Sequence, residues 1–144
     1  PLLRALRVDK MTLAALEATL DLYLEGEFTA LPLWGLATTT SDELEGRAVA
    51  LARRLVDELS DVKAEAIALR SVTGGGSLPG TELSSWGVAL SHPTKAADEI
   101  ARGLRAAPVP VVARVEEARL VLDLRTVFPV QDEALLSALV HALA

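Results

Sequence analysis

The fold is set largely by residues 111–124, whose sequence is VVARVEEARLVLDL. Apolar residues alternate with other residues on both sides of a short polar joint, Glu116-Glu117-Ala118. This alternation places the apolar side chains on one face of an extended chain. Two such runs around a short joint are typical of a β-hairpin. We therefore predict two antiparallel strands, with these side chains facing a core: Val111, Ala113, Val115, Leu120, Leu122 and Leu124.

Two further strands are expected upstream of this hairpin. Residues 64–72 have the composition of a strand, through Ile67, Leu69 and Val72. Residues 85–90 alternate apolar with small or polar residues, which is the pattern of a half-buried strand. Between them, the glycine-rich residues 73–80 interrupt regular structure.

Helical periodicity covers most of the remaining chain. Asp9 is a suitable N-cap for a helix over about residues 10–25. Thr40 and Glu43 have the spacing of a capping box, which predicts a second helix running to about Leu59. Thr94 can cap a third helix, and a fourth runs from about Gln131 to the end.

The order of these elements predicts an α+β fold. Short strands in hairpins pack into two layers when the helices cover one face of the sheet. We expect a short antiparallel sheet of about four strands within residues 41–144, which form the small domain. Residues 1–40 are then a linking helix, or arm, that connects this domain to another.

Composition narrows the class of function. The chain has 144 residues, a formal net charge of −6, three lysines and no cysteine. The net negative charge argues against a free-standing nucleic-acid-binding protein, which needs clustered Lys and Arg to neutralise phosphates. The lack of cysteine excludes disulfides, thiolate metal sites and cysteine nucleophiles. Without an apolar run long enough to span a bilayer, and without a signal-peptide pattern, the expected location is the cytoplasm.

Arg4 and Arg7 are the first candidate site residues. At a spacing of three they share one face if the backbone is helical, and two guanidiniums there would suit a phosphate-like oxyanion. If the backbone is extended, they point to opposite faces. The alternative is a pair of solvated surface charges, which spacing alone favours.

The glycine-rich segment is the second candidate. Its pattern is neither a dinucleotide fingerprint nor a phosphate-binding loop, but consecutive glycines permit a close approach of the backbone to another group. It is either a wide connection between strands or a loop that lines a site. Its members are Gly74, Gly75, Gly76, Ser77, Leu78, Pro79 and Gly80.

The remaining polar residues do not assemble a catalytic group. His92 and His141 have no partner at metal-ligand spacing, and Ser77 has no identifiable base. Lys10 would serve as a Schiff-base lysine only if it were buried, and the flanking sequence gives no support for that. We therefore predict no catalytic residue and no metal site in this chain.

Three stretches together resemble the bacterial selenocysteine synthases, the L-seryl-tRNA(Sec) selenium transferases. The first is residues 4–17, RALRVDKMTLAALE, which resembles the stretch after the cofactor-lysine region in that family. The second is residues 74–80, GGGSLPG, which resembles its glycine-rich loop, and the third is residues 120–127, LVLDLRTV. The resemblance runs in order from residue 4 to about 140, and on it the chain is identified as the carboxy-terminal part of such an enzyme.

The resemblance carries several implications for function. The family consists of fold-type I pyridoxal-phosphate (PLP) enzymes that convert seryl-tRNA(Sec) to selenocysteinyl-tRNA(Sec) with selenophosphate and assemble into homo-oligomers. The Schiff-base lysine would lie in a large domain outside this chain, so we expect no bound PLP here and no activity from the chain alone. The family's active-site arginines map onto Arg4 and Arg7, which makes selenophosphate or phosphate binding the favoured reading for this pair. Residues 74–80 would border the cleft, and tRNA would bind mainly elsewhere.

Two alternatives remain open at this stage. One is the small domain of another fold-type I lyase or transferase. The other is a stand-alone α+β interaction module without chemistry. Pro1 in place of an initiator Met leads us to expect a piece of a longer polypeptide.

Overall fold

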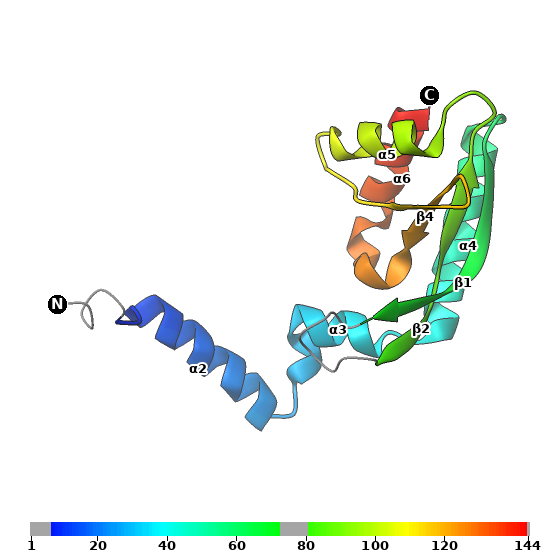
Figure 1. Ribbon diagram of the computed structural model, residues 1–144. Coiled ribbons are helices and arrows are strands. Elements are labelled where there is room, and N and C mark those ends of the chain that lie inside the picture. The colour runs from blue at the N-terminus through cyan, green and yellow to red at the C-terminus, as the bar shows by residue number, and fades with distance from the viewer. Residues whose placement is uncertain (1–6, 73–80, 144) are drawn as a thin grey trace. The chain divides into compact units, whose positions relative to one another are not determined.

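The computed structural model describes residues 7–72 and 81–143, and the chain divides into two compact units. Unit 1 is Pro1–Thr38 and unit 2 is Thr39–Ala144. The helices and the strands β1, β2 and β4 are labelled in Figure 1.

Unit 1 contains the helices α2, Lys10–Leu24, and α3, Pro32–Thr38, with a 3-10 turn at Phe28–Ala30 between them. Asp9 is the N-cap of α2, as the sequence predicted: its Oδ1 accepts the N–H groups of Met11 at 2.9 Å and Thr12 at 3.0 Å. No residue of α2 is buried, although most of its large side chains are apolar. A helix that is apolar around most of its circumference is typical of one covered by other protein.

Unit 2 contains an antiparallel sheet in the order β1-β2-β4-β3. Its strands are β1 Lys63–Val72, β2 Glu82–Ser91, β3 Arg114–Glu116 and β4 Arg119–Asp123. Ten residue pairs join β1 to β2, from Lys63↔Ser91 to Val72↔Glu82, which makes a long two-stranded ribbon. The predicted sheet of about four strands is confirmed.

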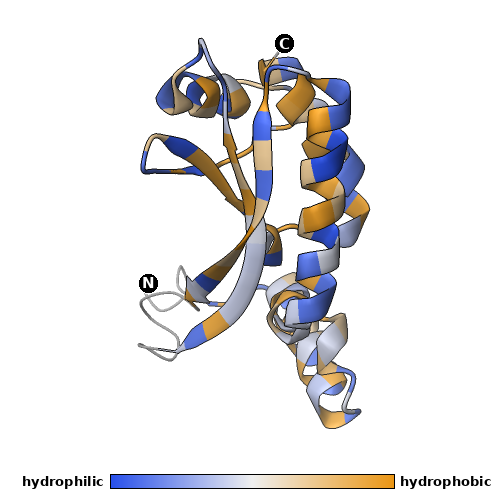
Figure 2. Cartoon of the chain, turned by 90° about the vertical axis from the view of Figure 1, so that its right-hand side faces the viewer, coloured by the Kyte–Doolittle hydropathy of each residue, from blue (hydrophilic) through white to orange (hydrophobic). Residues whose placement is uncertain are grey.

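Three helices of unit 2 pack against this sheet: α4 Ser41–Glu58, α5 Ala97–Arg105 and α6 Asp132–Leu143. Figure 1 shows α4 running along the β1–β2 ribbon. The apolar stripe of α4, which includes Leu44, Leu51 and Leu55, meets alternate residues of the strands in a single core. In Figure 2, the orange apolar positions alternate with blue polar ones along these helices. The fold is therefore α+β, as predicted.

The hairpin between β3 and β4 turns on two residues with positive φ. Glu117 has φ 50° and Ala118 has φ 61°, and the strands close on the pair Glu116↔Arg119. Positive φ at both central residues is the requirement of a type I′ turn, whose twist matches that of the strands. The sequence placed this turn correctly, although neither residue is the Asn or Gly that such turns prefer.

Three local predictions were wrong in detail. Thr94 does not cap α5, whose N-cap is Ala96 with no side-chain hydrogen bond; the Thr94 N–H donates instead to His92 Nδ1. The strand predicted from Val111 begins only at Arg114, and the Val111 N–H donates to the carbonyl of Leu104. Leu124 lies in a 3-10 turn, Leu124–Thr126, because the Asp123 carboxylate accepts the Arg125 N–H and so turns the chain.

Gly87 allows β1, β2 and β4 to pack closely at the centre of the sheet. A Cβ at this position would lie 1.9 Å from the carbonyl oxygen of Leu122 and 2.6 Å from Cδ1 of Leu69. No side chain fits into that space, so glycine is required here by close approach.

Candidate functional site

Of the two predicted oxyanion-binding arginines, only Arg7 lies in the described part of the chain; Arg4 lies outside it. Arg7 is exposed and precedes the N-cap of α2 by two residues. It forms no ion pair with a carboxylate among the described residues. A cation beside a helix N-terminus gains nothing from the helix dipole, which is positive at that end. The position of Arg7 is therefore not explained by the stability of α2.

The predicted cleft loop, residues 74–80, also lies outside the described residues, so its conformation was not tested. The strands on either side of this loop pair with each other. Val72 ends β1, Glu82 begins β2, and these two residues are paired in the antiparallel register. Arg70 donates to the Glu82 carboxylate at 2.5 Å across the same end of the ribbon. The segment therefore connects two neighbouring strands, and whether it also borders a site stays a prediction.

The three lysines of the chain, Lys10, Lys63 and Lys95, differ in exposure and contacts. Lys10 and Lys63 are exposed. Lys95 is partly buried, but its Nζ donates to the carbonyls of Leu143 at 2.9 Å and Ala142 at 3.4 Å. This contact stabilises the C-terminal end of α6, where free carbonyls favour a cation.

A polar cluster that the sequence analysis did not single out lies where β1, β2 and β4 meet. The Asp123 carboxylate accepts the hydroxyl protons of Ser71 at 2.5 Å and Ser85 at 2.6 Å. It also accepts the backbone N–H of Arg125 at 3.1 Å. Ser71 and Ser85 are buried, with 9% and 1% of their surface exposed. One carboxylate thus joins both strands of the long ribbon to the turn after β4.

Arg125 extends this cluster toward the start of unit 2. It is 7% exposed, and its Nη1 donates to the carbonyl oxygen of Thr39 at 2.9 Å. Its Nη2 donates to the carbonyl oxygen of Ser84 in β2. A buried guanidinium is costly unless it forms hydrogen bonds, and here Nη1 and Nη2 donate to backbone carbonyls of distant segments.

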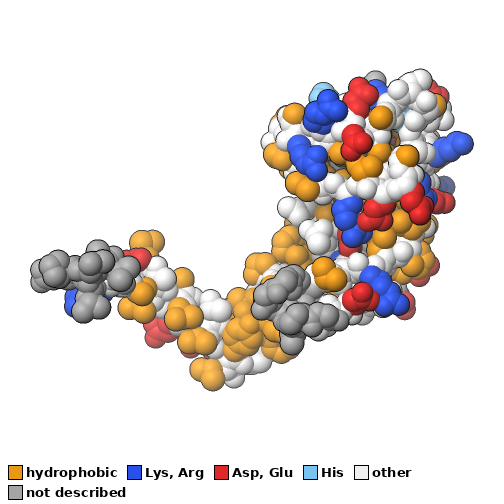
Figure 3. Space-filling model, in the orientation of Figure 1, with side chains coloured by type: hydrophobic (Ala, Val, Ile, Leu, Met, Phe, Trp, Pro, Cys, Tyr) orange, Lys and Arg blue, Asp and Glu red, His pale blue; other side chains and the backbone are white. Residues whose placement is uncertain are grey.

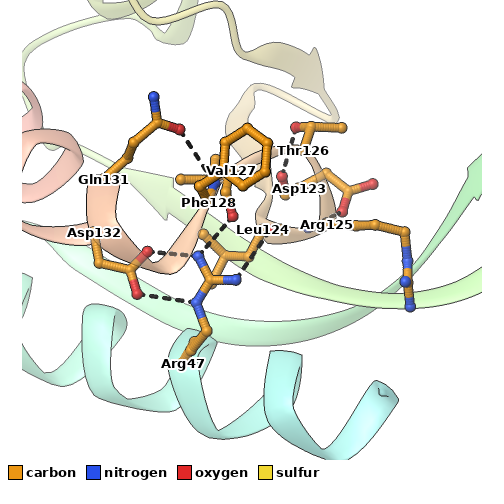
Figure 4. Close-up of polar contacts among 9 residues, drawn as sticks. All are labelled: Arg47, Asp123, Leu124, Arg125, Thr126, Val127, Phe128, Gln131 and Asp132. Atoms are coloured by element: carbon orange, nitrogen blue, oxygen red, sulfur yellow. Dashed lines mark hydrogen bonds and ion pairs between the residues drawn. The ribbon is translucent and has the colours of Figure 1, made fainter. Parts of the chain in front are cut away.

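A second arginine, Arg47, holds the opposite side of the same turn (Figure 4). From α4, its guanidinium forms two hydrogen bonds with the Asp132 carboxylate, Nε–Oδ2 at 2.9 Å and Nη2–Oδ1 at 2.6 Å. It also donates to the carbonyls of Val127 at 2.8 Å and Leu124 at 3.4 Å. Arg47 therefore joins α4 to the start of α6, entirely within unit 2.

Many of the surface charges of unit 2 are mixed in sign and paired, as the adjacent red and blue groups in Figure 3 illustrate. Arg119 donates to Glu65 at 2.5 Å, and Arg54 binds Glu133 through both carboxylate oxygens. Arg54 lowers the pKa of Glu133 chiefly through this side-chain hydrogen bond, which in turn raises the pKa of Arg54. Such pairing leaves these arginines poorly suited to neutralising phosphates.

Two classes of site are not found in residues 7–72 and 81–143. Within these ranges no three His, Asp or Glu side chains come together in a way that could hold a metal ion. Among the same residues, no helix is both long enough and apolar enough to cross a bilayer.

Comparison with known proteins identifies the family. Residues 1–128 match the family described as SelA, L-seryl-tRNA selenium transferase. The chain belongs to this family. The L-seryl-tRNA(Sec) selenium transferase of Aquifex aeolicus is 39% identical over 128 residues, which cover 89% of this chain and 28% of the relative. That of Moorella thermoacetica is 40% identical over 146 residues, covering 99% of this chain and 31% of the relative. The resemblance stated from the sequence is confirmed.

The chain spans less than a third of the length of these selenium transferases. The match covers all of unit 1 and, in unit 2, the whole sheet and the turn at Arg125, so it includes residues of both units.

Asp123 and Arg125 are the candidate functional residues that sequence reasoning missed. A signal was present, because Asp123 interrupts the apolar run from Leu120 to Leu124 and Arg125 follows that run directly. Nothing in the sequence shows that their partners are Ser71, Ser85 and Thr39, because those contacts span between 38 and 86 positions.

Proposed function

We propose that this chain is the carboxy-terminal part of an L-seryl-tRNA(Sec) selenium transferase and that it is inactive alone. The observation that carries the proposal is the family match over nearly the whole chain, combined with coverage of only 28–31% of the Aquifex aeolicus and Moorella thermoacetica relatives. The placement of the three lysines supports it, since Lys10 and Lys63 are exposed and the Nζ of Lys95 is bonded to backbone carbonyls. The proposed reaction converts seryl-tRNA(Sec) to selenocysteinyl-tRNA(Sec) with selenophosphate, in the cytoplasm.

Within this proposal, the chain contributes substrate contacts and supporting structure. Arg4 and Arg7 hold the oxyanion of selenophosphate, or the phosphate left after transfer, through charge-assisted hydrogen bonds. The exposure of Arg7 leaves its guanidinium accessible for this role. PLP, when bound in the complete enzyme, stabilises negative charge at the α-carbon of the seryl group. Residues 74–80 border the cleft in which this occurs.

The exposed apolar surface of α2 fits an arm that connects two domains. Met11 and Leu24 are each 84% exposed, and Leu13, Leu16 and Leu20 are more than half exposed. Contiguous apolar surface of this kind is rarely left in water and usually marks an interface. We propose that the rest of the enzyme, and neighbouring copies in a homo-oligomer, cover it.

A chimeric enzyme tests the proposal. Residues 1–144 replace the matching segment of the Moorella thermoacetica transferase, with which they align over 99% of their length. We expect the chimera to form selenocysteinyl-tRNA(Sec) from seryl-tRNA(Sec) and selenophosphate. The controls are the same relative with the segment deleted and the 144-residue chain by itself, both of which we expect to be inactive.

Two outcomes would contradict the proposal. A chimera that folds and binds PLP but makes no product would remove the proposed activity. A PLP adduct on the isolated 144-residue chain, seen as a stoichiometric change in the cofactor spectrum, would show that one of its own lysines is the anchor.

A further inference from the structure

The contacts of Arg125 bring together three parts of unit 2 that are distant in sequence. Thr39 is the first residue of unit 2 and follows Thr38, the last residue of α3. Ser84 lies in β2, while Arg125 lies in the turn after β4. The Arg125 guanidinium donates to the carbonyls of Thr39 and Ser84. The backbone N–H of Arg125 donates to the Asp123 carboxylate.

Stability alone is a weak explanation for this arrangement. Burying a guanidinium removes it from water at a cost in free energy, and well-packed apolar residues often stabilise a core as well. Arg47 differs, because it faces the carboxylate of Asp132 and remains partly exposed at 15%. The Nη1 and Nη2 groups of Arg125 donate to two backbone carbonyls, and these two contacts fix the position of the main chain.

The main-chain position that it fixes is the place where the polypeptide enters unit 2. Thr40, the next residue, is the N-cap of α4, and a capping box with Glu43 holds it. Held by Arg125 on one side and by the capping box on the other, the Thr39–Thr40 peptide is tied both to the sheet and to α4. The Asp123 contacts with Ser71 and Ser85 hold the sheet side of this link.

We infer that Arg125 is a positioning residue that anchors the connection between units 1 and 2 to the sheet. This inference rests on the proposed function, in which Arg4 and Arg7 of unit 1 contact selenophosphate. Anchoring Thr39 limits the directions in which the chain can leave unit 2. Loss of the anchor therefore lowers the rate of selenium transfer without removing any group that touches a substrate.

Amide hydrogen exchange on the 144-residue chain tests the anchor without any activity measurement. Arg125→Met removes both carbonyl contacts, and Arg125→Lys keeps the charge but cannot span both carbonyls with one ammonium group. Arg47→Met is the matched control, because it removes a guanidinium that binds the same turn from α4 but does not contact Thr39. We expect either Arg125 variant to exchange at least about tenfold faster at the Thr40 N–H, relative to amides in the middle of α4, which report global opening.

The same exchange measurement can contradict the proposed anchoring of Thr39 by Arg125. Equal acceleration at Thr40 in the Arg47 and Arg125 variants, or none in any of them, would overturn the anchor. If Arg125→Met does not fold, Arg125→Lys decides the question by the same measurement.

Steady-state kinetics of the chimera then tests the link to catalysis. We expect Arg125→Lys to lower kcat about tenfold with little change in KM for selenophosphate, and Arg47→Met to leave both near wild type below its melting temperature. A kcat loss shared equally by the two variants would assign Arg125 a purely structural role. An inactive wild-type chimera would instead count against the proposed function and leave the exchange result standing.

Discussion

Arg47 and Asp132, 85 positions apart in sequence, form a two-pronged ion pair that joins α4 to the first residue of α6. The arginine side chain is 15% exposed and the aspartate side chain 34%, so water screens the pair only in part. Charge-assisted, two-pronged pairs of this kind are the stronger ones in proteins.

Asp132→Asn is therefore expected to destabilise unit 2. The change removes the charge and one acceptor while Arg47 stays in place, and hydrogen bonds to charged groups contribute about 1.5–3 kcal/mol each. Urea unfolding followed by circular dichroism measures the loss. Arg53→Ala is the control, because Arg53 is 82% exposed and its contact with Asp57 is a surface pair. A loss for Asp132→Asn no larger than for Arg53→Ala would contradict the prediction.

Replacing either of two glycines in unit 2 with alanine should change the free energy of unfolding, in opposite directions. Gly87→Ala places a Cβ 1.9 Å from the Leu122 carbonyl oxygen, so the sheet must shift, and we expect a loss of more than about 3 kcal/mol. Gly46 lies in the interior of α4 with no atom within 4 Å of its added Cβ. Gly46→Ala should therefore stabilise the chain by up to about 1 kcal/mol. Thermal unfolding of the two variants checks both signs, and a tolerated Gly87→Ala would mean that β2 and β4 approach each other less closely.

The β3–β4 turn offers a stabilising change. Ala118 has φ 61°, a conformation that disfavours a residue with a Cβ by roughly 1–2 kcal/mol. Glycine removes that cost but makes the unfolded chain more flexible, which offsets about 0.4–1 kcal/mol. Ala118→Gly should thus raise the unfolding free energy by about 0.5 kcal/mol. Ala68→Gly in β1 is the comparison and should lower it, because Ala68 lies in a strand interior. Destabilisation by both changes would argue against a type I′ turn.

The sequence predicts the local elements well where one signal dominates. The capping box at Thr40 and Glu43 begins α4 where expected, and the alternation around Glu116-Glu117-Ala118 gives the hairpin. Prediction from the sequence fails where tertiary contacts compete with the local pattern of residues. Val111 has the alternation of a strand, but its N–H bonds to Leu104, and the neighbouring Pro108 and Pro110 have no N–H to offer a sheet ladder.

For the candidate site, too, one part could be inferred from the sequence and another part could not. The family could be inferred from short motifs, because the order of residue types along the chain is itself the signal. The Arg125 and Asp123 contacts could not, because hydrogen-bond partners from β1, β2 and the start of unit 2 are brought together only by the folded sheet.

The capping box should make stability depend on pH in a defined direction. Hydrogen bonds from the backbone N–H and then the hydroxyl of Thr40 lower the pKa of Glu43 below its ordinary value of 4.5. The stabilisation from the carboxylate is therefore complete above that value and is lost as the pH falls through the lower, folded-state pKa. Glu43→Gln can still accept from the Thr40 N–H but does not titrate.

We expect the wild-type chain to lose stability relative to Glu43→Gln when the pH is lowered from about 6 to about 3, and the difference to be constant above about 6. Chemical unfolding at a series of pH values measures it. A difference that stays the same across the whole range would show that Glu43 has the same pKa in the folded and unfolded chains.

Substitution of Arg7 and Arg4 tests the proposed oxyanion contact most directly. In the chimera described above, Arg7→Ala or Arg4→Ala should lower the rate of selenium transfer, because each removes a charge-assisted hydrogen bond worth about 1.5–3 kcal/mol. That range corresponds to a loss of about ten- to a hundredfold in kcat/KM for selenophosphate.

Arg7 is exposed and precedes α2, so Arg7→Ala should leave the melting temperature unchanged. Arg53→Ala again serves as the control for loss of a surface arginine. Because a lysine cannot match the two-pronged geometry of a guanidinium on an oxyanion, Arg7→Lys should recover only part of the rate. Normal turnover with selenophosphate in both alanine variants would remove the oxyanion role from this pair and return Arg7 to an ordinary solvated charge.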